Sequence, residues 1–523
     1  MQSMNGAETL VRTLLAGGID VCFANPGTSE MQFVAALDRI PGMRCVLALF
    51  EGVATGAADG YARMTDRPAS TLLHLAPGLA NGLANLHNAK RAQVPVVNIV
   101  GEHRQGHKAT DSPLTGDIEG VARTMSYWMK TSTSADDIAA DAAEAIREAN
   151  ALPGRIATLI LPADTAWTEV RMPPGSVPLR FDPVTPTMPS DAHFDDAIRA
   201  LRSGENTTIV LAGRALRAKS LELASKIAQK TGARLIAPYG IGRLERGIGR
   251  VEIGRIPAVV DAGVAAFKDA RHVILIGAKV PAPMFGYPGK PDVLVHPNAQ
   301  LIHLASDGDD LHATLSELVE RLAASQIVPA LVRPEEVALP EGELTPEAVL
   351  RAVAALMPSD AIIADESITA GRMFFPFSRA APQHDYLQLT GGSLGCGIPM
   401  ATGAAIACPD RKVINMEGDG SSLYTLQGLW TQARERLNVL TIVFANRGYQ
   451  ILKGELRAVG AEVWGERAER MLSIADPDIN WVKLAEGMGV EAGAASTAAE
   501  LVRLMKHAMA RPGPFLIEAR IGR

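Results

Sequence analysis

The chain has 523 residues, 47% of them hydrophobic, so it can form several hydrophobic cores, and three domains are the first expectation. Its formal net charge is −6 and its basic residues are dispersed, which argues against a nucleic-acid-binding protein. No apolar run approaches the roughly 18 residues of a membrane span, and four cysteines without CxxC spacing predict neither a disulfide framework nor a metal knuckle, which fits a reducing cytoplasm.

The N-terminal stretch, MQSMNGAETLVRTLLAGGIDV, predicts an amphipathic helix, and it lacks the basic start and cleavage site of a signal peptide. Beyond it, short apolar runs alternate with longer helical patterns. β-rich runs between helices predict an α/β fold in which parallel sheets are covered by helices on both faces. The predicted strands include Ile156–Pro162, Thr208–Gly213, Val273–Ala278, Ala361–Asp365, Val413–Gly420 and Val439–Asn446.

Two proline-rich stretches divide the chain. Met172–Ser190 and Ile327–Thr345 lack helical periodicity, and proline removes a backbone donor. We therefore expect three α/β domains, at residues 1–172, 190–327 and 345–523.

The strongest chemical signal lies in the last third of the chain. A strand-like run, VINME, leads into Gly418-Asp419-Gly420-Ser421, and the next predicted strand ends at Asn446, 27 residues after Asp419. A strand–helix–strand unit of this length places both residues at the carboxyl ends of neighbouring parallel strands, where open α/β sheets bind ligands.

Asp419 and Asn446 suit Mg²⁺, which takes about six oxygens and only one or two of them from carboxylates. A backbone carbonyl near Gly448 could supply a third protein ligand, and diphosphate oxygens and water suit the remaining positions. Gly418 and Gly420 allow the backbone to approach phosphates closely, and the amides that follow them would favour anionic oxygens. The alternative for a lone GDG is a plain Asp–Gly turn.

This pattern resembles the signature of the thiamine-diphosphate-dependent decarboxylase and carboligase superfamily, most closely benzoylformate decarboxylase and acetolactate-synthase-like proteins. The resemblance covers essentially the whole chain, although Arg447 stands where the family often has a second asparagine. It implies Mg²⁺-bound thiamine diphosphate as the cofactor. It also implies a pyrimidine-binding first domain, a Rossmann-like central domain and a diphosphate-binding last domain.

Two further segments of the last domain match the family. Gly391-Gly392-Ser393-Leu394-Gly395 resembles the segment whose bulky residue, here Leu394, supports the bent cofactor. Glu366-Ser367-Ile368-Thr369 resembles a second phosphate-contacting turn. The alternative for Ser367 and Thr369 is a simple helix cap.

Three residues of the first domain match catalytic positions. Glu51, in LFEGVA before ADGYA, resembles the glutamate that shares a proton with N1′ of the aminopyrimidine, and its apolar neighbours favour the protonated form. Thr28, in Asn25-Pro26-Gly27-Thr28, stands where benzoylformate decarboxylase has a serine that meets the substrate carboxylate. His74 matches a histidine that transfers protons. The alternative for Glu51 is an exposed glutamate at a helix start, and the alternative for His74 is a structural histidine.

The expected substrate pocket departs from benzoylformate decarboxylase. Met284 aligns near its second catalytic histidine, and Glu455 replaces an aromatic residue. His103 and His107, on a loop, could replace the lost histidine or face solvent. The central domain has only weak glycine motifs, GIG at 240–242 and 247–249, so we infer no FAD.

The resemblance implies non-oxidative decarboxylation of a 2-oxo acid through an ylid and an enamine, in a homodimer or homotetramer with sites at the interface. Met284 and Glu455 favour small or polar 2-oxo acids as substrates. The runner-up is a carboligase like acetolactate synthase; a non-catalytic cofactor-binding paralogue and a flavin-dependent oxidase are weaker alternatives. The expected cofactor site comprises Asn25, Pro26, Gly27, Glu51, Ser367, Thr369, Gly392, Leu394, Gly418, Asp419, Gly420, Ser421, Asn446, Gly448 and Tyr449, and the expected substrate pocket comprises Thr28, His74, Met284, Ile451 and Glu455.

Overall fold

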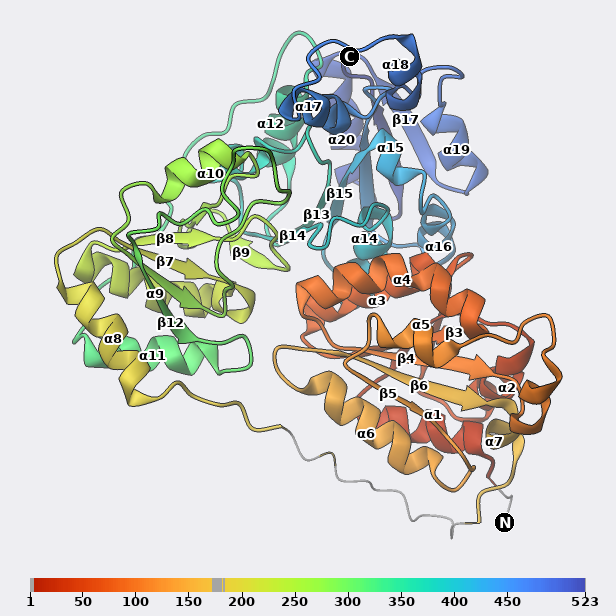
Figure 1. Ribbon diagram of the computed structural model, residues 1–523. Helices are drawn as coiled ribbons and strands as arrows, with labels where there is room; N and C mark the ends of the chain where they lie inside the picture. Colours follow the sequence, from red (N-terminus) through yellow and green to blue (C-terminus); the bar gives the residue numbers. More distant parts are fainter. Residues whose placement is uncertain (1–3, 172–180, 182–183, 523) are drawn as a thin grey trace.

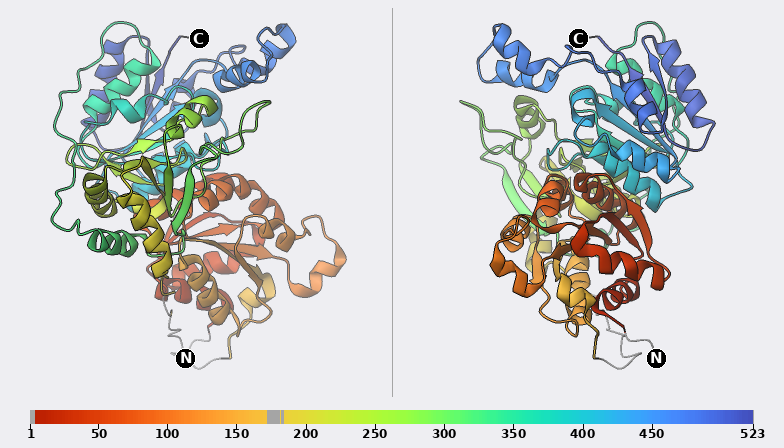
Figure 2. Two further views of the ribbon diagram at one scale, coloured as in Figure 1. Left: turned by 60° about the vertical axis from the view of Figure 1, so that its left-hand side comes forward. Right: turned by 90° about the vertical axis from the view of Figure 1, so that its right-hand side faces the viewer.

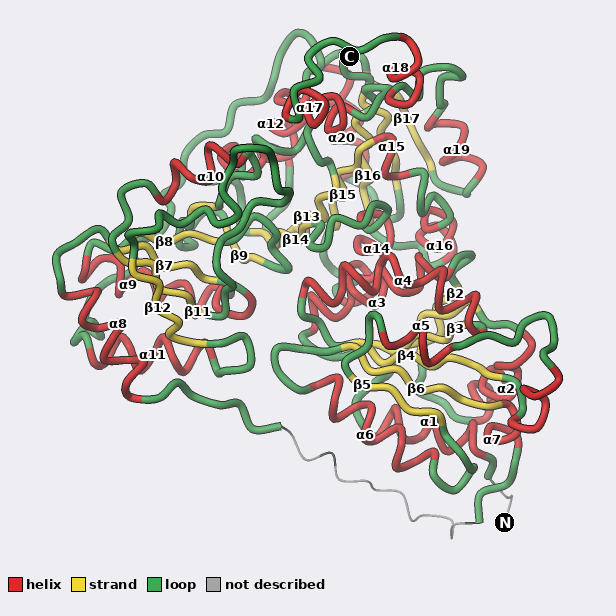
Figure 3. Tube along the Cα trace, in the orientation of Figure 1, coloured by secondary structure: helices red, strands yellow, loops and turns green. Residues whose placement is uncertain are grey.

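The computed structural model describes residues 4–171, 181 and 184–522, and it contains three sheets flanked by helices (Figures 1 and 3). Most of the predicted linker Met172–Ser190 lies outside the described residues. The second predicted linker, Ile327–Thr345, has no helix and no regular strand, only isolated bridges at Leu331 and Glu343. Among the helices of the described residues, none is both long and apolar enough to cross a membrane.

The first sheet contains six parallel strands in the order β2-β1-β3-β4-β6-β5. Helices cover both of its faces, so β3, β4 and β6 are buried along their whole lengths. The predicted N-terminal helix is present, and Asn5 and Glu8 form a capping box at its start. The elements are β1 (Val21–Asn25), β2 (Arg44–Leu47), β3 (Ala69–Leu73), β4 (Val96–Glu102), β5 (Trp128–Thr131), β6 (Ile156–Pro162), α1 (Gly6–Ala16), the 3₁₀ turn η1 (Thr28–Glu30), α2 (Met31–Arg39), α3 (Glu51–Thr65), α4 (Leu75–Ala92), the 3₁₀ turn η2 (Gln105–Thr110), α5 (Ile118–Arg123), α6 (Ile138–Asn150) and α7 (Ala163–Trp167).

The second sheet has five parallel strands in the order β10-β8-β7-β11-β12 and lies on the left of Figure 1. Its central strands are apolar and buried, as their sequences predicted. The elements are β7 (Thr207–Leu211), β8 (Arg234–Ala237), β10 (Gly254–Arg255), β11 (His272–Ile276), β12 (Gln300–Ala305), α8 (Asp191–Arg202), the 3₁₀ turn η3 (Gly213–Leu216), α9 (Ala218–Thr231), α10 (Val260–Phe267) and α11 (Leu311–Arg321).

The third sheet has seven strands in the order β17-β18-β16-β15-β13-β14-β9. Six are parallel, and the seventh, β9 (Leu244–Arg246), comes from the middle of the chain and pairs antiparallel with β14. This strand was not predicted from the sequence. The other elements are β13 (Ala361–Glu366), β14 (His384–Gln388), β15 (Val413–Gly418), β16 (Val439–Phe444), β17 (Glu491–Ala495), β18 (Phe515–Ala519), α12 (Pro346–Leu356), α13 (Phe374–Phe377), α14 (Gly397–Ala407), α15 (Asp419–Ser422), α16 (Gly428–Arg434), α17 (Gln450–Ala458), α18 (Glu466–Leu472), α19 (Trp481–Gly487) and α20 (Ala498–Met509).

Helices α3 and α14 join the first and third sheets, and they share one apolar core (Figure 1). Glycine permits their close approach, because a Cβ on Gly403 would lie 1.8 Å from the carbonyl oxygen of Ala57. Arg63 of α3 is fully buried, pairs with Asp59 at 2.6 Å and donates to the carbonyl oxygen of Gln388 at 2.7 Å. The ion pair lies within α3, and the hydrogen bond from Arg63 to Gln388 connects this helix to the third unit.

Candidate functional site

The carboxyl ends of β15 and β16 bring Asp419 and Asn446 to one edge of the third sheet, since these strands pair up to their last residues. Asp419 is 4% exposed; its Oδ1 accepts from the amide of Gly420 (2.9 Å) and its Oδ2 from the amide of Arg447 (2.5 Å). Asn446 Oδ1 accepts from the amide of Gly448 at 3.0 Å. The side chains that the sequence paired thus belong to one hydrogen-bonded loop system.

This edge fits a hard divalent cation. Burial raises the pKa of Asp419 to about 6, although the amides of Arg447, Gly420 and Asn446 lower it, and a cation would favour the ionised form. In the described part of the chain, no cluster of three or more His, Cys, Asp or Glu side chains could hold a metal. A cation at Asp419 would therefore draw on amide and main-chain oxygens, a donor set that suits Mg²⁺.

The loop after Asn446 is strained at Arg447, whose φ is 60°. This left-handed conformation is uncommon for residues other than glycine, and asparagine tolerates it best among them. The Arg447 side chain leaves the loop and pairs with Asp478 at 2.8 Å. Tyr449 packs so closely on Gly420 that a Cβ there would lie 2.4 Å from the ring. The second asparagine often found in the resembling family therefore has a conformational explanation, and in this chain the arginine side chain lies outside the loop, against Asp478.

The turn after β13 also contains a strained residue. Ile368 has a φ of 52°, which is an outlier for a β-branched residue. Ser367 is buried, and its amide (3.0 Å) and hydroxyl both donate to Asp365 Oδ1. Within the described residues, the amides of Ile368 and Thr369 and the Thr369 hydroxyl donate to no protein acceptor. They form a set of free donors that an anion could use.

The loop that contains Leu394 is held from two sides. Glu366, 1% exposed at the end of β13, accepts from the amides of Gly395 (2.7 Å) and Gly397 (2.6 Å). Burial raises the pKa of Glu366 to about 7, and the amides of this loop lower it. From the other side, Asn88 of α4 donates to the carbonyl oxygen of Ser393 at 2.7 Å and accepts from its amide at 3.2 Å. Leu394, half-buried, is thus presented on a fixed loop.

Gly392 and Gly395 are required in this loop for different reasons. Gly392 has a φ of 76° and an open surrounding, whereas Gly395 has a φ of 88° and lies against Tyr424, whose Cβ would be 2.5 Å from an added Cβ. Both conformations favour glycine. The sequence identified the loop, but it gave no signal for Asn88, whose role depends on how α4 docks on the third unit.

Glu51 begins α3 and is 9% exposed. Asn81 of α4 donates its side-chain amide to Glu51 Oε2 at 3.0 Å. A Cβ on Gly78 would lie 3.1 Å from Glu51 Oε1, so glycine leaves that oxygen room. Asn81 therefore orients the Glu51 carboxylate at Oε2, while Gly78 leaves space beside Oε1. Asn81 was not among the residues predicted from the sequence.

His74 and Thr28 follow neighbouring strands of the first sheet, β3 and β1. His74 Nδ1 lies 2.8 Å from Glu30 Oε2, which also accepts from the amide of Gly27 at 2.7 Å. Glu30 is 2% exposed; burial raises its pKa, and the charge of His74 lowers it. Sequence reasoning missed Glu30, although its place at the start of a helix, two residues after Thr28, is a signal for a capping carboxylate. Thr28 is exposed beside this pair.

One predicted pocket residue, Glu455, connects the third unit to the middle unit. Glu455 of α17 accepts from the Tyr287 hydroxyl at 2.5 Å, and this hydrogen bond raises the pKa of Tyr287 to about 12. Met284, three residues earlier, is 54% exposed, and Ile451 is half-buried on α17. In Figure 2 the α17–α18 segment projects from the third unit. Within the described residues, no hydrogen bond or ion pair joins this group to Thr28 or His74.

In one chain the two halves of the candidate site occupy different edges. In the views of Figures 1 and 2, α2, which follows β1 and Thr28, lies in the lower unit, and α15, which follows β15, lies in the upper one.

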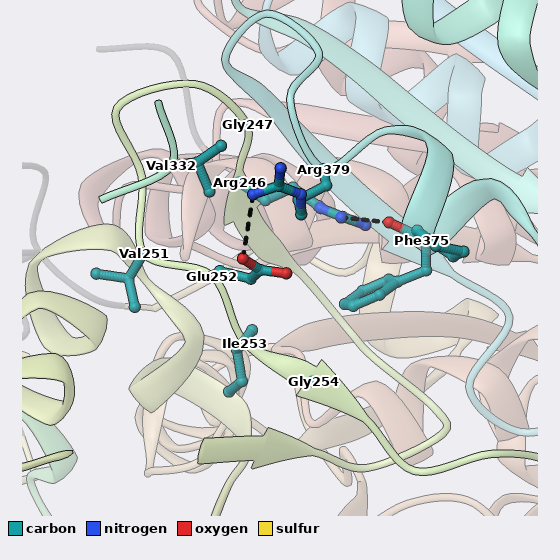
Figure 4. A pocket seen from close by; sticks show the side chains of 10 residues that line it. Arg246, Gly247, Val251, Glu252, Ile253, Gly254, Val332, Phe375 and Arg379 are labelled. Carbon is teal, nitrogen blue, oxygen red and sulfur yellow. Dashed lines mark hydrogen bonds and ion pairs between the residues drawn. The ribbon is translucent and has the colours of Figure 1, made fainter. Parts of the chain in front are cut away.

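A separate cavity of about 310 Å³ lies between the middle unit and the third sheet, where Glu252 and Arg379 face each other (Figure 4). None of the predicted site residues lines this cavity.

Comparisons with known proteins identify the family of the chain. Models of the N-terminal and C-terminal TPP-binding domains of thiamine pyrophosphate enzymes match residues 4–121 and 368–519. IlvX of Mycobacterium tuberculosis, which carries the name of an acetolactate synthase large subunit, is 46% identical over 98% of both chains. Benzoylformate decarboxylase of Pseudomonas aeruginosa is 30% identical over 96% of both. A solved thiamine diphosphate-dependent 4-hydroxybenzoylformate decarboxylase of Rhodococcus jostii is 26% identical, covers 99% of both chains and has a TM-score of 0.84.

Proposed function

The chain belongs to the thiamine pyrophosphate enzyme family, and from this premise we propose that it decarboxylates a 2-oxo acid with Mg²⁺ and thiamine diphosphate. The observation that carries the proposal is the pair of buried carboxylates at the two expected cofactor positions, Glu51 and Asp419. Bound thiamine diphosphate supplies a carbon nucleophile and an electron sink for cleaving a bond next to a carbonyl. In this proposal residues 1–172 bind the pyrimidine, 345–523 bind the diphosphate, and 190–327 form the Rossmann-like central domain.

Magnesium and the diphosphate are assigned to the edge of the third sheet. Asp419 and Asn446 provide side-chain oxygens and Gly448 a carbonyl for Mg²⁺. Gly418 and Gly420 give the diphosphate access to the backbone. The free amides after Ser367, together with Ser421, Thr369 and Tyr449, complete the expected surroundings of the diphosphate.

Glu51 is proposed to hold and exchange a proton at N1′ of the aminopyrimidine. Its orientation by Asn81 supports this role, because a fixed carboxylate spends no energy on reorienting when the proton moves. Leu394, with Gly392 beside it, provides the apolar surface on which the cofactor bends. The hydrogen bonds of Glu366 support that assignment, since they fix this loop.

His74 is proposed to transfer protons to and from the reacting substrate. If Nδ1–H donates to Glu30, Nε2 is left as the atom that exchanges the proton. Thr28 is proposed to meet the substrate carboxylate through its hydroxyl. Asn25, Pro26 and Gly27 shape the approach to the cofactor, and Gly27 is suited to this because any Cβ there would collide with the His74 ring.

Small or polar 2-oxo acids are the proposed substrates. Met284 removes a proton donor present in benzoylformate decarboxylase, and burying the charge of Glu455 against an aromatic ring would be costly. The Tyr287–Glu455 hydrogen bond supports a polar rim beside Ile451. We therefore expect poor turnover of benzoylformate, and Met284→His is expected to raise it.

A panel of 2-oxo acids tests the proposal. The protein is supplied with Mg²⁺ and thiamine diphosphate, and CO₂ and aldehyde are measured, with Glu51→Gln as the inactive variant and the exposed Glu119→Gln as its control. Glu51→Gln should bind the cofactor and lose most activity, because glutamine cannot exchange the proton. No CO₂ from any acid, or full activity of Glu51→Gln, would contradict the proposal.

Carboligation of the acetolactate synthase type is the second candidate, and the 46% identity with IlvX favours it. The two reactions share every step up to loss of CO₂. Pyruvate alone separates them: a decarboxylase releases one acetaldehyde and one CO₂ for each pyruvate, whereas a carboligase releases one acetolactate and one CO₂ for every two pyruvates.

We also propose a homodimer or homotetramer in the cytoplasm. In Figure 1, α2 and α15 lie in different units of one chain, which supports shared sites. The exposed Leu423 (38%) and Tyr424 (55%) directly after α15 would gain cover from a second copy. The four cysteines are free, which suits a reducing compartment. Light scattering of the active enzyme tests the assembly, and an active monomer would contradict it.

A further inference from the structure

We propose that Tyr386 is a positioning residue for the cofactor, which acts through Asp365 to hold the turn Ser367–Ile368–Thr369 in its left-handed conformation. The inference rests on the proposed function, because it assigns this turn to the diphosphate. It adds residues from β14 and from the middle unit that do not touch the cofactor themselves.

The contacts form a continuous chain of hydrogen bonds. Tyr386 is fully buried, and its hydroxyl donates to Asp365 Oδ2 at 2.6 Å. Asp365 Oδ1 accepts from the amide of Ser367 at 3.0 Å and from its hydroxyl. Burial and the charge of Asp365 raise the pKa of Tyr386 well above its ordinary value, so its hydroxyl stays protonated as the donor. One carboxylate thus connects the tyrosine to the turn.

The turn needs such a restraint because its conformation is unfavourable in itself. Ile368 lies at a φ of 52°, where its branched side chain crowds the backbone. The turn also folds back tightly, since a Cβ on Gly371 would lie 1.8 Å from Ser367 Oγ. Without the bonds from Asp365, we expect the turn to relax to an ordinary conformation.

Relaxation would affect the groups assigned to the diphosphate. The Ser367 hydroxyl is committed to Asp365, so the available donors are the amides of Ile368 and Thr369 and the Thr369 hydroxyl. Their directions are set by the dihedral angles of Ile368. A carboxylate that fixes these angles therefore prepares the donors before the cofactor arrives, which lowers the cost of binding.

The middle unit reaches the same tyrosine. Arg255 of β10 donates to the Tyr386 hydroxyl at 3.2 Å, and its guanidinium lies 4.9 Å from the ring centre of Phe375. The guanidinium of Arg246 of β9 also lies over the Phe375 ring, 3.8 Å from its centre, beside the cavity in Figure 4. The tyrosine is thus fixed by both units, which keeps its hydroxyl directed at Asp365.

Calorimetric titration of thiamine diphosphate at fixed Mg²⁺ tests the proposal in the full-length protein. Tyr386→Phe removes one hydrogen bond to a carboxylate, so we expect about tenfold weaker cofactor binding, with kcat at saturating cofactor within about twofold of the wild type. Ile368→Gly removes the backbone penalty. In that background, Tyr386→Phe should cost less than about threefold, because the turn no longer needs the restraint.

Tyr127→Phe is the matched control, since Tyr127 is 56% exposed in the first unit and should leave the affinity unchanged. Equal affinity of Tyr386→Phe and wild type, or an equal loss in both backgrounds, would overturn the proposal while leaving the proposed function intact. If Tyr386→Phe does not fold, Ser367→Ala breaks the same chain and should show the same rescue by Ile368→Gly. A wild-type protein that binds no thiamine diphosphate would overturn the proposed function and this inference together.

Discussion

Replacing Glu30 with glutamine should slow the proton transfers of His74 without affecting Glu51. In the structure Glu30 Oε2 accepts two hydrogen bonds, from His74 Nδ1 (2.8 Å) and from the amide of Gly27 (2.7 Å). Glu30 Oε1 is buried without a partner, and a Cβ on Gly101 would lie 1.6 Å from it. Oε2 of Glu30 therefore has two hydrogen-bond donors, whereas Oε1 is buried and has no donor.

Glutamine can satisfy this site in neither orientation. With its NH₂ group at the Oε1 position, it buries a donor beside Gly101 that has no acceptor. With the NH₂ group at the Oε2 position, it opposes the Gly27 amide and turns His74 Nδ1 into an acceptor, which places the proton on Nε2. Neither orientation keeps a carboxylate charge beside His74, and a hydrogen bond between charged groups contributes about 1.5–3 kcal/mol. Steps in which His74 gains its second proton should therefore slow by about 10- to 150-fold.

Two assays separate this effect from general damage. In Glu30→Gln, kcat for the best 2-oxo acid should fall within that range, while exchange of the cofactor C2 proton, followed by NMR after acid quench, should stay at the wild-type rate. Asp141→Asn is the control, because Asp141 is a buried carboxylate of the same unit that accepts from Ser132 at 2.8 Å, away from the site. A kcat within about twofold of wild type, or a parallel loss of C2 exchange, would refute the reasoning.

Three further outcomes are expected. Asp419→Ala should abolish tight binding of thiamine diphosphate with Mg²⁺, because it deletes the only charged protein ligand of the proposed site; unchanged affinity by calorimetry would remove the metal assignment. Arg447→Asn should stabilise the fold by about 1 kcal/mol, since asparagine tolerates the left-handed φ; a lower melting temperature would show that the Asp478 pair matters more. Burial, with the charge of Arg246, lowers the pKa of His384 to about 3, so the folded chain keeps it neutral while the unfolded chain takes up a proton below about pH 6.5. Its contribution to stability is present above that pH and is lost on acidification, by about 2 kcal/mol at pH 5. In urea unfolding, His384→Gln should therefore lose about 2 kcal/mol less than wild type between pH 7 and pH 5, and an equal loss would exclude the mechanism.

The fold was predictable where burial dictates the sequence. Strands covered on both faces must be apolar throughout, so runs such as Ile156–Pro162 and Val439–Phe444 were visible without a structure. β9 was not, because three residues carry no periodicity and its formation depends on the free edge of β14. The sequence pattern of a strand or helix indicates which of its residues are buried, but it indicates little about which other element packs against it.

The same limit applies to the candidate site. Asp419 and Asn446 could be paired because both follow strands that are neighbours in the chain as well as in the sheet. Asn88 reaches the Leu394 loop from α4, 305 residues earlier in the sequence, and Glu366 reaches it through side-chain contacts to backbone amides that no strand pattern encodes. The residues expected to meet the cofactor were therefore accessible to sequence reasoning, and those that orient them were not.

The pairing of β9 with β14 has a consequence for any attempt to isolate the third unit. An uncovered strand edge offers unpaired amide and carbonyl groups to other chains and promotes aggregation. A fragment that starts at residue 345 would lack Leu244–Arg246 and would leave His384–Tyr386 as such an edge. We expect it to self-associate unless that edge receives a charged residue or a proline. The smallest independent unit that contains Asp419 is therefore discontinuous in sequence, and it includes a three-residue strand encoded about a hundred residues before the rest.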